Sequence, residues 1–280
     1  MLEVGKQNTM RVIKRLPFGA ILVHDDDESA EEVLIPKRYE PENCQINDIV
    51  NVFVYLDSED RIIATTETPF AHVEGFGFLK VVDVNKTGAF FDWGLSKDLL
   101  VPYGEQMYPV KVGSYHMVYL YLDDRSSRIT GSLKIDKWLK EETFYLKQDQ
   151  AVDLMIYAKT ELGFKAIVNN DYSGLLYKNE IFQTLNIGDK LQGFIKQIRP
   201  DNKIDLTLQK PSEETRDALT DTILEDLKQQ GGSSTLTDKS NPEDIYAYYG
   251  VSKKSYKKAL GALYKKRLIM IDKDKVSLIK

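Results

Sequence analysis

The sequence contains a single cysteine, Cys44, which excludes an intrachain disulfide and any metal site built from several thiolates. It also has no uninterrupted apolar run approaching the roughly 18 residues that a membrane-spanning helix needs. Residues 1–5 lack the basic segment followed by an apolar one that marks a secretory signal. These absences predict a protein of the reducing cytoplasm that has no membrane contact.

Groups that carry out catalysis are equally scarce. The three histidines, His24, His72 and His116, fall in different segments, and no Gly-rich loop precedes a helix in the pattern that cradles phosphates. His24 is followed by acids at residues 25–28, but consecutive acids splay their side chains and lack the spaced ligands and the glycine of a calcium loop. We therefore expect no enzyme activity, no metal site and no cofactor.

Negative charge predominates in the chain as a whole but not at its end. The formal net charge is −5, yet residues 252–280 contain ten Lys and Arg against two Asp, a local charge of +8 that leaves −13 for the rest. A basic end on an acidic body is typical of a chain with one contact surface for polyanions. A solvated Lys-rich helix has the same composition, so this alternative stays open.

The chain contains one pattern of short segments in which apolar and polar residues alternate, and this pattern occurs three times. Runs of alternating apolar and polar residues, separated by Gly, Asn and Asp turns, predict antiparallel strands joined by hairpins. From Gly163 to Tyr177 is 14 residues, as is Gly88 to Pro102, and both copies reach a second glycine turn 11 residues later. The first copy is longer by three residues, in an acidic loop at 25–32. A repeat of about 70 residues predicts three copies of one small barrel.

After Pro211 the apolar spacing changes from two residues to about 3.6, as in amphipathic helices. We expect a first helix with Ser212 as its N-cap and Gly231 and Gly232 at its end. Asn241 and Pro242 then predict the cap and first turn of a helix over 243–249, which Gly250 stops.

A third helix is expected over 253–266, with Ser252 as its cap. Its apolar residues recur on one side: Tyr256, Ala259, Leu260 and Leu263. Two short apolar runs, 268–271 and 276–279, predict a terminal hairpin. Two helices joined by a Gly turn and followed by a hairpin are typical of a winged helix.

The sequence thus predicts a mainly β chain with an α+β C-terminal domain. The expected domains are barrels at 1–66, 67–133 and 150–210, a connector at 134–149 and a winged helix at 211–280. We expect the connector to be partly helical and to pack its apolar residues against a neighbouring barrel; with Leu133 before it, these are Ile135, Trp138, Leu139, Phe144 and Leu146. Trp93 is interpreted as a core residue rather than a stacking platform.

The order of strand, Gly-aromatic turn, apolar-Pro or Gly-Leu-Leu segment, Gly-Asp turn and basic-Ile strand resembles the S1 domain. That domain is a five-stranded oligonucleotide-binding (OB-fold) barrel. With the winged helix included, the whole chain is similar to the conserved virulence factor B family of bacterial RNA-binding proteins. We expect a cytoplasmic, non-catalytic protein that binds single-stranded RNA. The resemblance implies a role in post-transcriptional or broader control of gene expression, virulence genes included.

The resemblance also implies which barrel residues would contact RNA. Matched position by position, the first copy supplies Phe18, Ile21, Pro36 and Arg61; the second Thr87, Phe90, Pro102 and Arg128; the third Leu162, Lys165, Tyr177 and Lys203. Each copy keeps only one aromatic ring at these positions. Lys196 and Arg199 make the third copy the most complete, so it is the favoured site. For Phe18 and Phe90, an alternative role as rim residues of the core stays open.

In the winged helix, phosphate contact is expected from five lysines: Lys253, Lys254, Lys257, Lys258 and Lys273. The outer face of the third helix has no Arg, Asn or Gln to read base edges, which favours nonspecific or single-strand contact. Two alternatives remain: a protein-interaction scaffold with degenerate barrels, and a DNA-binding regulator that uses the winged helix alone. The oligomeric state is left open by the sequence.

Overall fold

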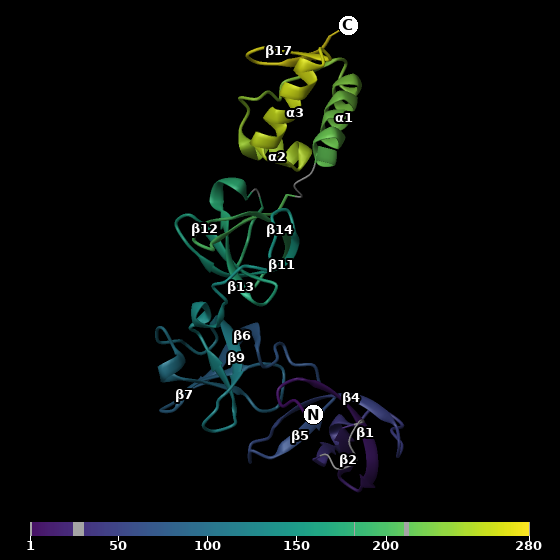
Figure 1. The fold of residues 1–280 in the computed structure, drawn as a ribbon, viewed down its shortest axis with the longest axis vertical. Coiled ribbons are helices and arrows are strands. Elements are labelled where there is room, and N and C mark those ends of the chain that lie inside the picture. Colours follow the sequence, from purple (N-terminus) through teal and green to yellow (C-terminus); the bar gives the residue numbers. More distant parts are fainter. Residues whose placement is uncertain (1, 25–30, 182, 210–212, 280) are drawn as a thin grey trace. The chain divides into compact units, whose positions relative to one another are not determined.

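A computed structural model describes residues 2–24, 31–181, 183–209 and 213–279. The chain divides into two compact units, Met1–Leu139 and Lys140–Lys280 (Figure 1). The N-terminal unit contains two closed five-stranded barrels, and the C-terminal unit contains a third barrel and a helical domain with a small sheet. The predicted fold class is therefore confirmed. No helix in the described ranges is long and apolar enough to cross a membrane.

The first barrel consists of β1 (Gln7–Leu16), β2 (Gly19–His24), β3 (Val33–Pro36), β4 (Ile49–Leu56) and β5 (Ile62–Thr65), in the order β1-β2-β3-β5-β4. Neighbouring strands are antiparallel except β3 and β5, which are parallel. Along β1 the buried and exposed residues alternate, so that Met10 and Val12 point into the core. This is the period of two that the sequence predicted.

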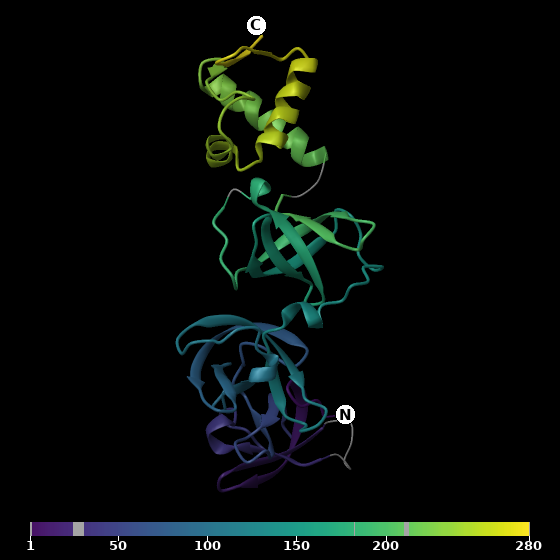
Figure 2. The same cartoon turned by 90° about the vertical axis from the view of Figure 1, so that its left-hand side faces the viewer.

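The second and third barrels repeat this topology. The second is built from β6 (Gly75–Val84), β7 (Gly88–Asp92), β8 (Leu99–Pro102), β9 (Tyr115–Leu122) and β10 (Ile129–Ser132). The third is built from β11 (Ala151–Lys159), β12 (Gly163–Val168), β13 (Tyr172–Tyr177), β14 (Lys190–Ile198) and β15 (Ile204–Thr207). Figure 2 shows the strands of the third barrel, in teal and green, curving around to form a closed barrel.

One hairpin register is common to the three barrels. The glycine that opens the second strand lies opposite the last residue of the third strand: Gly19 opposite Pro36, Gly88 opposite Pro102, and Gly163 opposite Tyr177. In each barrel the first strand also carries a bulge six residues before this glycine, at Ile13, Val82 and Tyr157. The three sequence copies are therefore in structural register, as their spacing predicted.

The first two barrels share apolar core. Trp93, only 2% exposed, lies edge-on to two rings of β4, with its ring centre 5.8 Å from Phe53 and 6.4 Å from Tyr55. Its indole N–H donates to the carbonyl of Lys97 at 2.5 Å. The interpretation of Trp93 as a core residue is confirmed, and the core that it completes belongs to both barrels.

Polar contacts reinforce this junction. The Lys97 ammonium donates to the carbonyl of Asp57 at 2.5 Å and to the carboxylate of Asp60 at 3.1 Å. Arg128, from the second barrel, also donates to Asp60. The turn between β4 and β5 is therefore held against the second barrel by two cations.

The connector contains a short 3-10 helix, Ile135–Trp138, as its mixed composition predicted. The ring of Trp138 stacks on Tyr119 and Tyr121 of β9, with ring centres 4.5 and 4.7 Å apart. Leu146 packs into the core of the third barrel. The expected packing of Phe144 was wrong, because this residue is 78% exposed.

The C-terminal domain consists of α1 (Glu213–Gln229), β16 (Ser233–Ser234), α2 (Pro242–Tyr249), α3 (Lys253–Lys265), β17 (Ile269–Ile271) and β18 (Val276–Leu278). The strands form a sheet in the order β16-β18-β17, so the predicted hairpin gains a third strand. Figure 1 shows α1 beside α3. Their apolar faces meet in one core: Leu219, Ile223 and Leu227 from α1, and Tyr256, Ala259, Leu260 and Leu263 from α3.

The helix ends follow the expected signals in part. Ser252 caps α3 by accepting a hydrogen bond from the backbone N–H of Ser255 at 3.1 Å. Gly250 ends α2 in a left-handed conformation, with φ of 66°. The amide of Gly232 closes α1 by donating to the carbonyl of Leu227 at 2.7 Å. Asn241 precedes α2, but its side chain makes no capping bond, which corrects that prediction. The proposed cap Ser212 lies outside the described residues.

Candidate nucleic-acid interface

The favoured site lies on the outer face of the third barrel, across β12, β13 and β15. Lys165 on β12 pairs with Leu175 on β13, and Leu175 in turn lies beside Asp205 on β15. Side chains of paired residues point to the same side of a sheet, so these three share one face. Tyr177 is on the same face because it follows Leu175 by two positions.

Tyr177 is the centre of a polar cluster on this face. Its hydroxyl donates to Asp205 Oδ1 at 3.2 Å and accepts a hydrogen bond from Arg199. Two cations lie near its ring, with the Lys196 ammonium 5.7 Å and the Arg199 guanidinium carbon 6.0 Å from the ring centre. Three of the predicted residues, Tyr177, Lys196 and Arg199, are thus brought together.

Acidic residues hold these cations in place. Asp205, only 8% exposed, accepts from Arg199 Nε at 3.0 Å, and this hydrogen bond raises the pKa of the guanidinium above its already high value. Glu180 accepts from the Lys196 ammonium at 2.5 Å. A base can stack on the aromatic ring while the cation fixed beside the ring contacts the phosphate of the same nucleotide.

Sequence reasoning missed Asp205, although a signal was available. In each copy the position of Asp205 lies two residues after the predicted basic side chain. The three residues at this position are Ile63, Thr130 and Asp205. Only the third copy has a carboxylate there, and a buried carboxylate needs a cationic partner. An alignment of the three copies would therefore have indicated that Arg199 has a fixed position.

Lys165 lies near a different ring from the one expected. Its ammonium is 5.2 Å from the ring centre of Tyr157, the bulged residue of β11, whose hydroxyl is 2.9 Å from Ser173 Oγ. Tyr157 is only 8% exposed, so its ring supports Lys165 rather than offering a stacking surface. Lys203 lies in the turn before β15, where it is paired with Asp201 at 2.7 Å.

In the first barrel, the two predicted residues have different surroundings. Phe18, in the turn between β1 and β2, is 61% exposed, which is more than a rim residue of the core would show. Arg61 is paired with Asp57 at 2.7 Å and with Glu59 at 2.9 Å, and the hydrogen bond to Asp57 raises the pKa of the guanidinium. Two acids therefore hold the Arg61 side chain, as Asp205 holds Arg199 in the third barrel.

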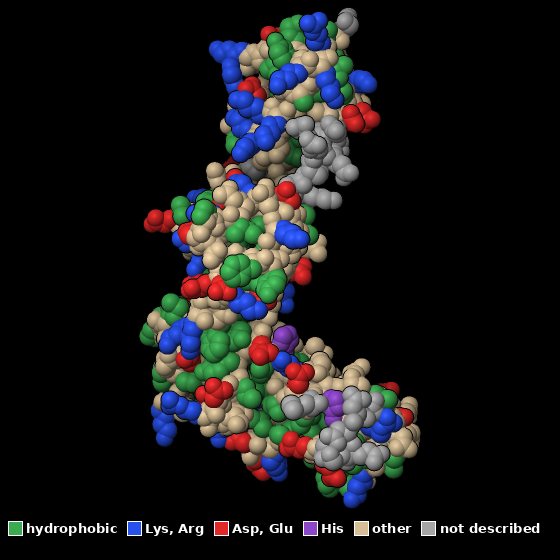
Figure 3. Space-filling view, viewed as in Figure 1, with side chains coloured by type: hydrophobic (Ala, Val, Ile, Leu, Met, Phe, Trp, Pro, Cys, Tyr) green, Lys and Arg blue, Asp and Glu red, His purple; other side chains and the backbone are tan. Residues whose placement is uncertain are grey.

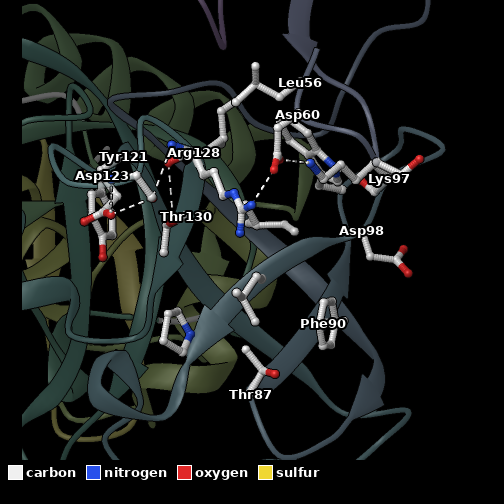
Figure 4. Close-up of a pocket in the computed structure, with 17 residues that line it drawn as sticks. Leu56, Asp60, Thr87, Phe90, Lys97, Asp98, Tyr121, Asp123, Arg128 and Thr130 are labelled. Carbon is white, nitrogen blue, oxygen red and sulfur yellow. Dashed lines mark hydrogen bonds and ion pairs between the residues drawn. The ribbon is translucent and has the colours of Figure 1, made fainter. Parts of the chain in front are cut away.

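In the second barrel, Phe90 and Arg128 line a cavity of about 560 Å³ together with residues of the first barrel (Figure 4). Figure 4 shows Asp60 between Arg128 and Lys97, so that Arg128 is held at the junction of the barrels. The cavity also contains Asp98, whose pKa is raised by burial. Carboxylates in this position disfavour a polyanion.

The balance of charge agrees with this difference. Residues 1–139 contain 15 Lys and Arg against 22 Asp and Glu, whereas residues 140–280 contain 23 against 21. On the face drawn in Figure 3, Lys and Arg side chains gather over the C-terminal domain. A polyanion is attracted more strongly to the C-terminal unit.

The outer face of α3 carries the lysines that were predicted, with one correction. Lys254, Lys257 and Lys258 are exposed, but Lys253 is half-buried and its ammonium donates to the carbonyl of Lys239 at 3.2 Å. Lys257 has one loose ion pair, 3.7 Å from Asp238. Within the described residues Lys254 and Lys258 form no ion pair, and neither does Lys273, which is exposed in the turn between β17 and β18.

Two further exposed residues of α3 were not predicted. Tyr264, 57% exposed, and Lys265 follow Lys257 and Lys258 by two helical turns. Their spacing of seven residues places them on the same side of the helix, which a helical projection of the sequence would have shown.

No group of three or more His, Cys, Asp or Glu side chains within the described ranges could hold a metal ion. The acids at 25–28, which were rejected as metal ligands, lie outside those ranges.

Comparison with known proteins gives two family matches. A family model of the S1 domain matches residues 4–67, and one of the CvfB-like winged helix domain matches residues 221–278. Protein YitL of Bacillus subtilis is 28% identical over 278 residues, which cover 94% of this chain and 90% of YitL. The Conserved virulence factor B of Staphylococcus epidermidis is 24% identical over 285 residues, which cover 99% of this chain and 92% of that protein.

Among solved structures, one similar chain is a multidomain protein with nucleic acid binding domains from Streptococcus pneumoniae. It is 25% identical, the alignment covers 99% of this chain and 98% of that chain, and the TM-score is 0.41.

Proposed function

Because the chain belongs to the conserved virulence factor B family, we propose that it binds single-stranded RNA, without chemically altering it, to regulate gene expression after transcription. The third barrel and the outer face of α3 hold the strand. The protein works in the cytoplasm, and the family name suggests that virulence genes are among those it controls.

The observation that carries this proposal is the cluster around Tyr177. Single-strand binding needs exposed rings on which bases stack and cations that meet the phosphates. In the third barrel two cations lie within 6.0 Å of a ring on one face, whereas prolines occupy the position of this ring in the other two barrels. One stacked base contributes roughly 1 to 3 kcal/mol to binding.

The lysines of α3 supply a second contact. Lysine ammoniums neutralise phosphates but do not read bases, so this surface adds affinity without sequence preference. Because both sites belong to one chain, binding at one raises the effective concentration of the strand at the other. Two weak sites on one chain therefore bind the strand more tightly than either site does alone.

The proposal is tested by anisotropy titrations of the full chain with a labelled single-stranded RNA at several salt concentrations. Tyr177→Ala should weaken binding roughly tenfold or more, because a base can no longer stack on the ring. Pro102→Ala, at the equivalent position of the second barrel, is the control and should change the affinity little.

A charge-reversal variant tests the helix surface separately. Glutamate at Lys254, Lys257 and Lys258 should lower the slope of log affinity against log salt by about 0.7 for each phosphate that the helix no longer neutralises. The matched control reverses three exposed lysines of the second barrel, Lys80, Lys86 and Lys111. If both the tyrosine and the α3 variants bind RNA like the original protein, the proposed function is wrong.

A protein-interaction scaffold is the second candidate, and one observation favours it. The second barrel exposes two neighbouring rings, Phe78 and Tyr115, whose centres lie 5.6 Å apart. Exposed apolar groups of this kind mark interaction surfaces. Indifference to both RNA and duplex DNA in the titrations would favour the scaffold, and a preference for duplex DNA would favour a DNA-binding regulator.

A further inference from the structure

A glycine lies inside α3, where it lowers the stability of the helix relative to alanine. Gly261 is eight residues after Lys253 and four before Lys265, the two ends of the helix. Glycine inside a helix weakens it relative to alanine, because the unfolded chain loses more freedom on folding. The position therefore carries a cost to stability.

Nothing inside the domain requires a glycine at this position. The φ of Gly261 is not positive, and a Cβ added to it would meet no atom within 4 Å. The barrel glycines differ, because at Gly163 an added Cβ would lie 2.0 Å from the carbonyl oxygen of Leu176. The open space at Gly261 faces solvent.

The residues around Gly261 form a distinct surface. Lys257 and Lys258 precede it by one turn, and Tyr264 and Lys265 follow it by one turn, so all four border it on the helix surface. All four are exposed. The buried residues of α3, Tyr256, Ala259, Leu260 and Leu263, lie on the other side. Gly261 is thus a stretch of bare backbone surrounded by three ammonium groups and one ring.

We propose that a phosphate of the bound RNA strand lies against the backbone of α3 at Gly261, with Lys257, Lys258 and Lys265 around it. This proposal rests on the proposed function and assigns the point of closest approach between RNA and the helix. The amides in mid-helix are committed to intrahelical bonds, so Gly261 supplies space and not hydrogen bonds. A side chain there would hold the phosphate away from the ammonium groups, and Coulomb attraction falls with distance.

Two variants of the full chain, Gly261→Ala and Gly261→Gln, test this assignment. Neither changes the net charge, and both replace glycine by a better helix former. Hydrogen exchange of the α3 amides should slow about two- to fivefold in Gly261→Ala, which shows that the domain is folded and stabilised. Affinity for single-stranded RNA should fall about threefold for alanine and about tenfold for glutamine, since a longer side chain displaces the phosphate further.

The salt dependence separates a steric effect from a change of charge. Both Gly261 variants should keep the salt slope within about 0.7 of the original value, the equivalent of one phosphate, because the lysines remain. Thr222→Gln, which places the same side chain on an exposed position of α1, is the control and should bind RNA normally.

The outcomes distinguish this assignment from the proposed function. Unchanged affinity in both Gly261 variants, together with weaker binding in the α3 charge-reversal variant, would overturn the contact at Gly261 and leave RNA binding by the helix intact. Unchanged affinity in the Gly261 and the charge-reversal variants alike would overturn RNA binding by α3, and the contact at Gly261 with it.

Discussion

Single residues set the geometry of the barrel faces. Gly19, Gly88 and Gly163 hold the same place in their barrels, and an added Cβ would lie 2.2, 2.4 and 2.0 Å from a carbonyl oxygen of the neighbouring strand. These contacts are with backbone, which cannot move aside without breaking the hairpin. In the third barrel, the same close approach sets the position of Tyr177 opposite Gly163.

Gly163→Ala should therefore destabilise the third barrel by at least about 1 to 3 kcal/mol, the usual cost of overpacking. Hydrogen exchange of the amides in β12 and β13 measures the effect, which should be faster exchange than in the original protein. Gly104→Ala is the matched control, because an added Cβ there would meet nothing within 4 Å. Equal exchange in the two variants would contradict the steric explanation.

The sequence predicted some residues of the cluster around Tyr177 and missed others for a physical reason. Tyr177 was predicted from the resemblance to the S1 domain, and Lys196 and Arg199 were predicted as the cations around it. Asp205 and Tyr157 were missed because they lie within the sheet, where a polar residue in an apolar pattern is read as part of the strand. The half-burial of Lys253 was missed because its partner, the carbonyl of Lys239, is a backbone group from a loop.

At the scale of elements, α3 combines two tasks in 13 residues. The apolar residues on one side of α3 pack into the core of the winged-helix domain, while the other side exposes lysines. The start of this helix depends on Ser252, whose side chain satisfies an otherwise unpaired amide at the first turn. By contrast, α2 begins without such a bond at Asn241.

Ser252→Ala should cost about 1 kcal/mol of stability, the typical worth of an N-cap. The expected sign is faster hydrogen exchange in the first turn of α3. Asn241→Ala serves as the comparison, since its side chain makes no capping bond and its removal should cost less. A larger effect at Asn241 than at Ser252 would contradict the observed cap geometry.

Element prediction succeeded where a period extends over many residues and failed where it does not. The helix α3 and strands such as β3, β8 and β13 follow periods of 3.6 or two that are visible in the sequence. The two-residue strand β16 has no period, because its pairing with β18 is decided by the packing of the domain. The predicted packing of Phe144 was wrong because Phe144 lies in a loop, where no period indicates which side of the chain is buried.

At the scale of the whole molecule, the N-terminal unit is one body made of two repeats. Asp60 on the first barrel is shared between Lys97 and Arg128 of the second. Hydrogen bonds from Lys97, and then from Arg128, lower the pKa of Asp60 below its ordinary value of 3.8. The stabilisation is therefore complete above this ordinary value and is lost as the pH falls through the lower value in the folded protein.

Acid should weaken the contact between the first two barrels below about pH 4. Fluorescence of Trp93, in a Trp138→Phe background, measures the change because Trp93 lies at the junction. Asp60→Asn should remove much of this acid response, whereas Asp124→Asn, at an exposed acid of the second barrel, should leave it unchanged. The same acid response in both variants would show that Asp60 does not control the junction.

The shared core around Trp93 has a consequence for biosynthesis. Phe53, Tyr55 and Ile63 belong to the first barrel to leave the ribosome, but they are covered by residues made later. Translation of the next 70 or so residues takes roughly 4 to 14 seconds in bacteria-like conditions, and during this time the apolar edge has no partner. We expect a nascent chain halted just after its first barrel has emerged from the ribosome to attract chaperones, and one whose second barrel has also emerged to release them.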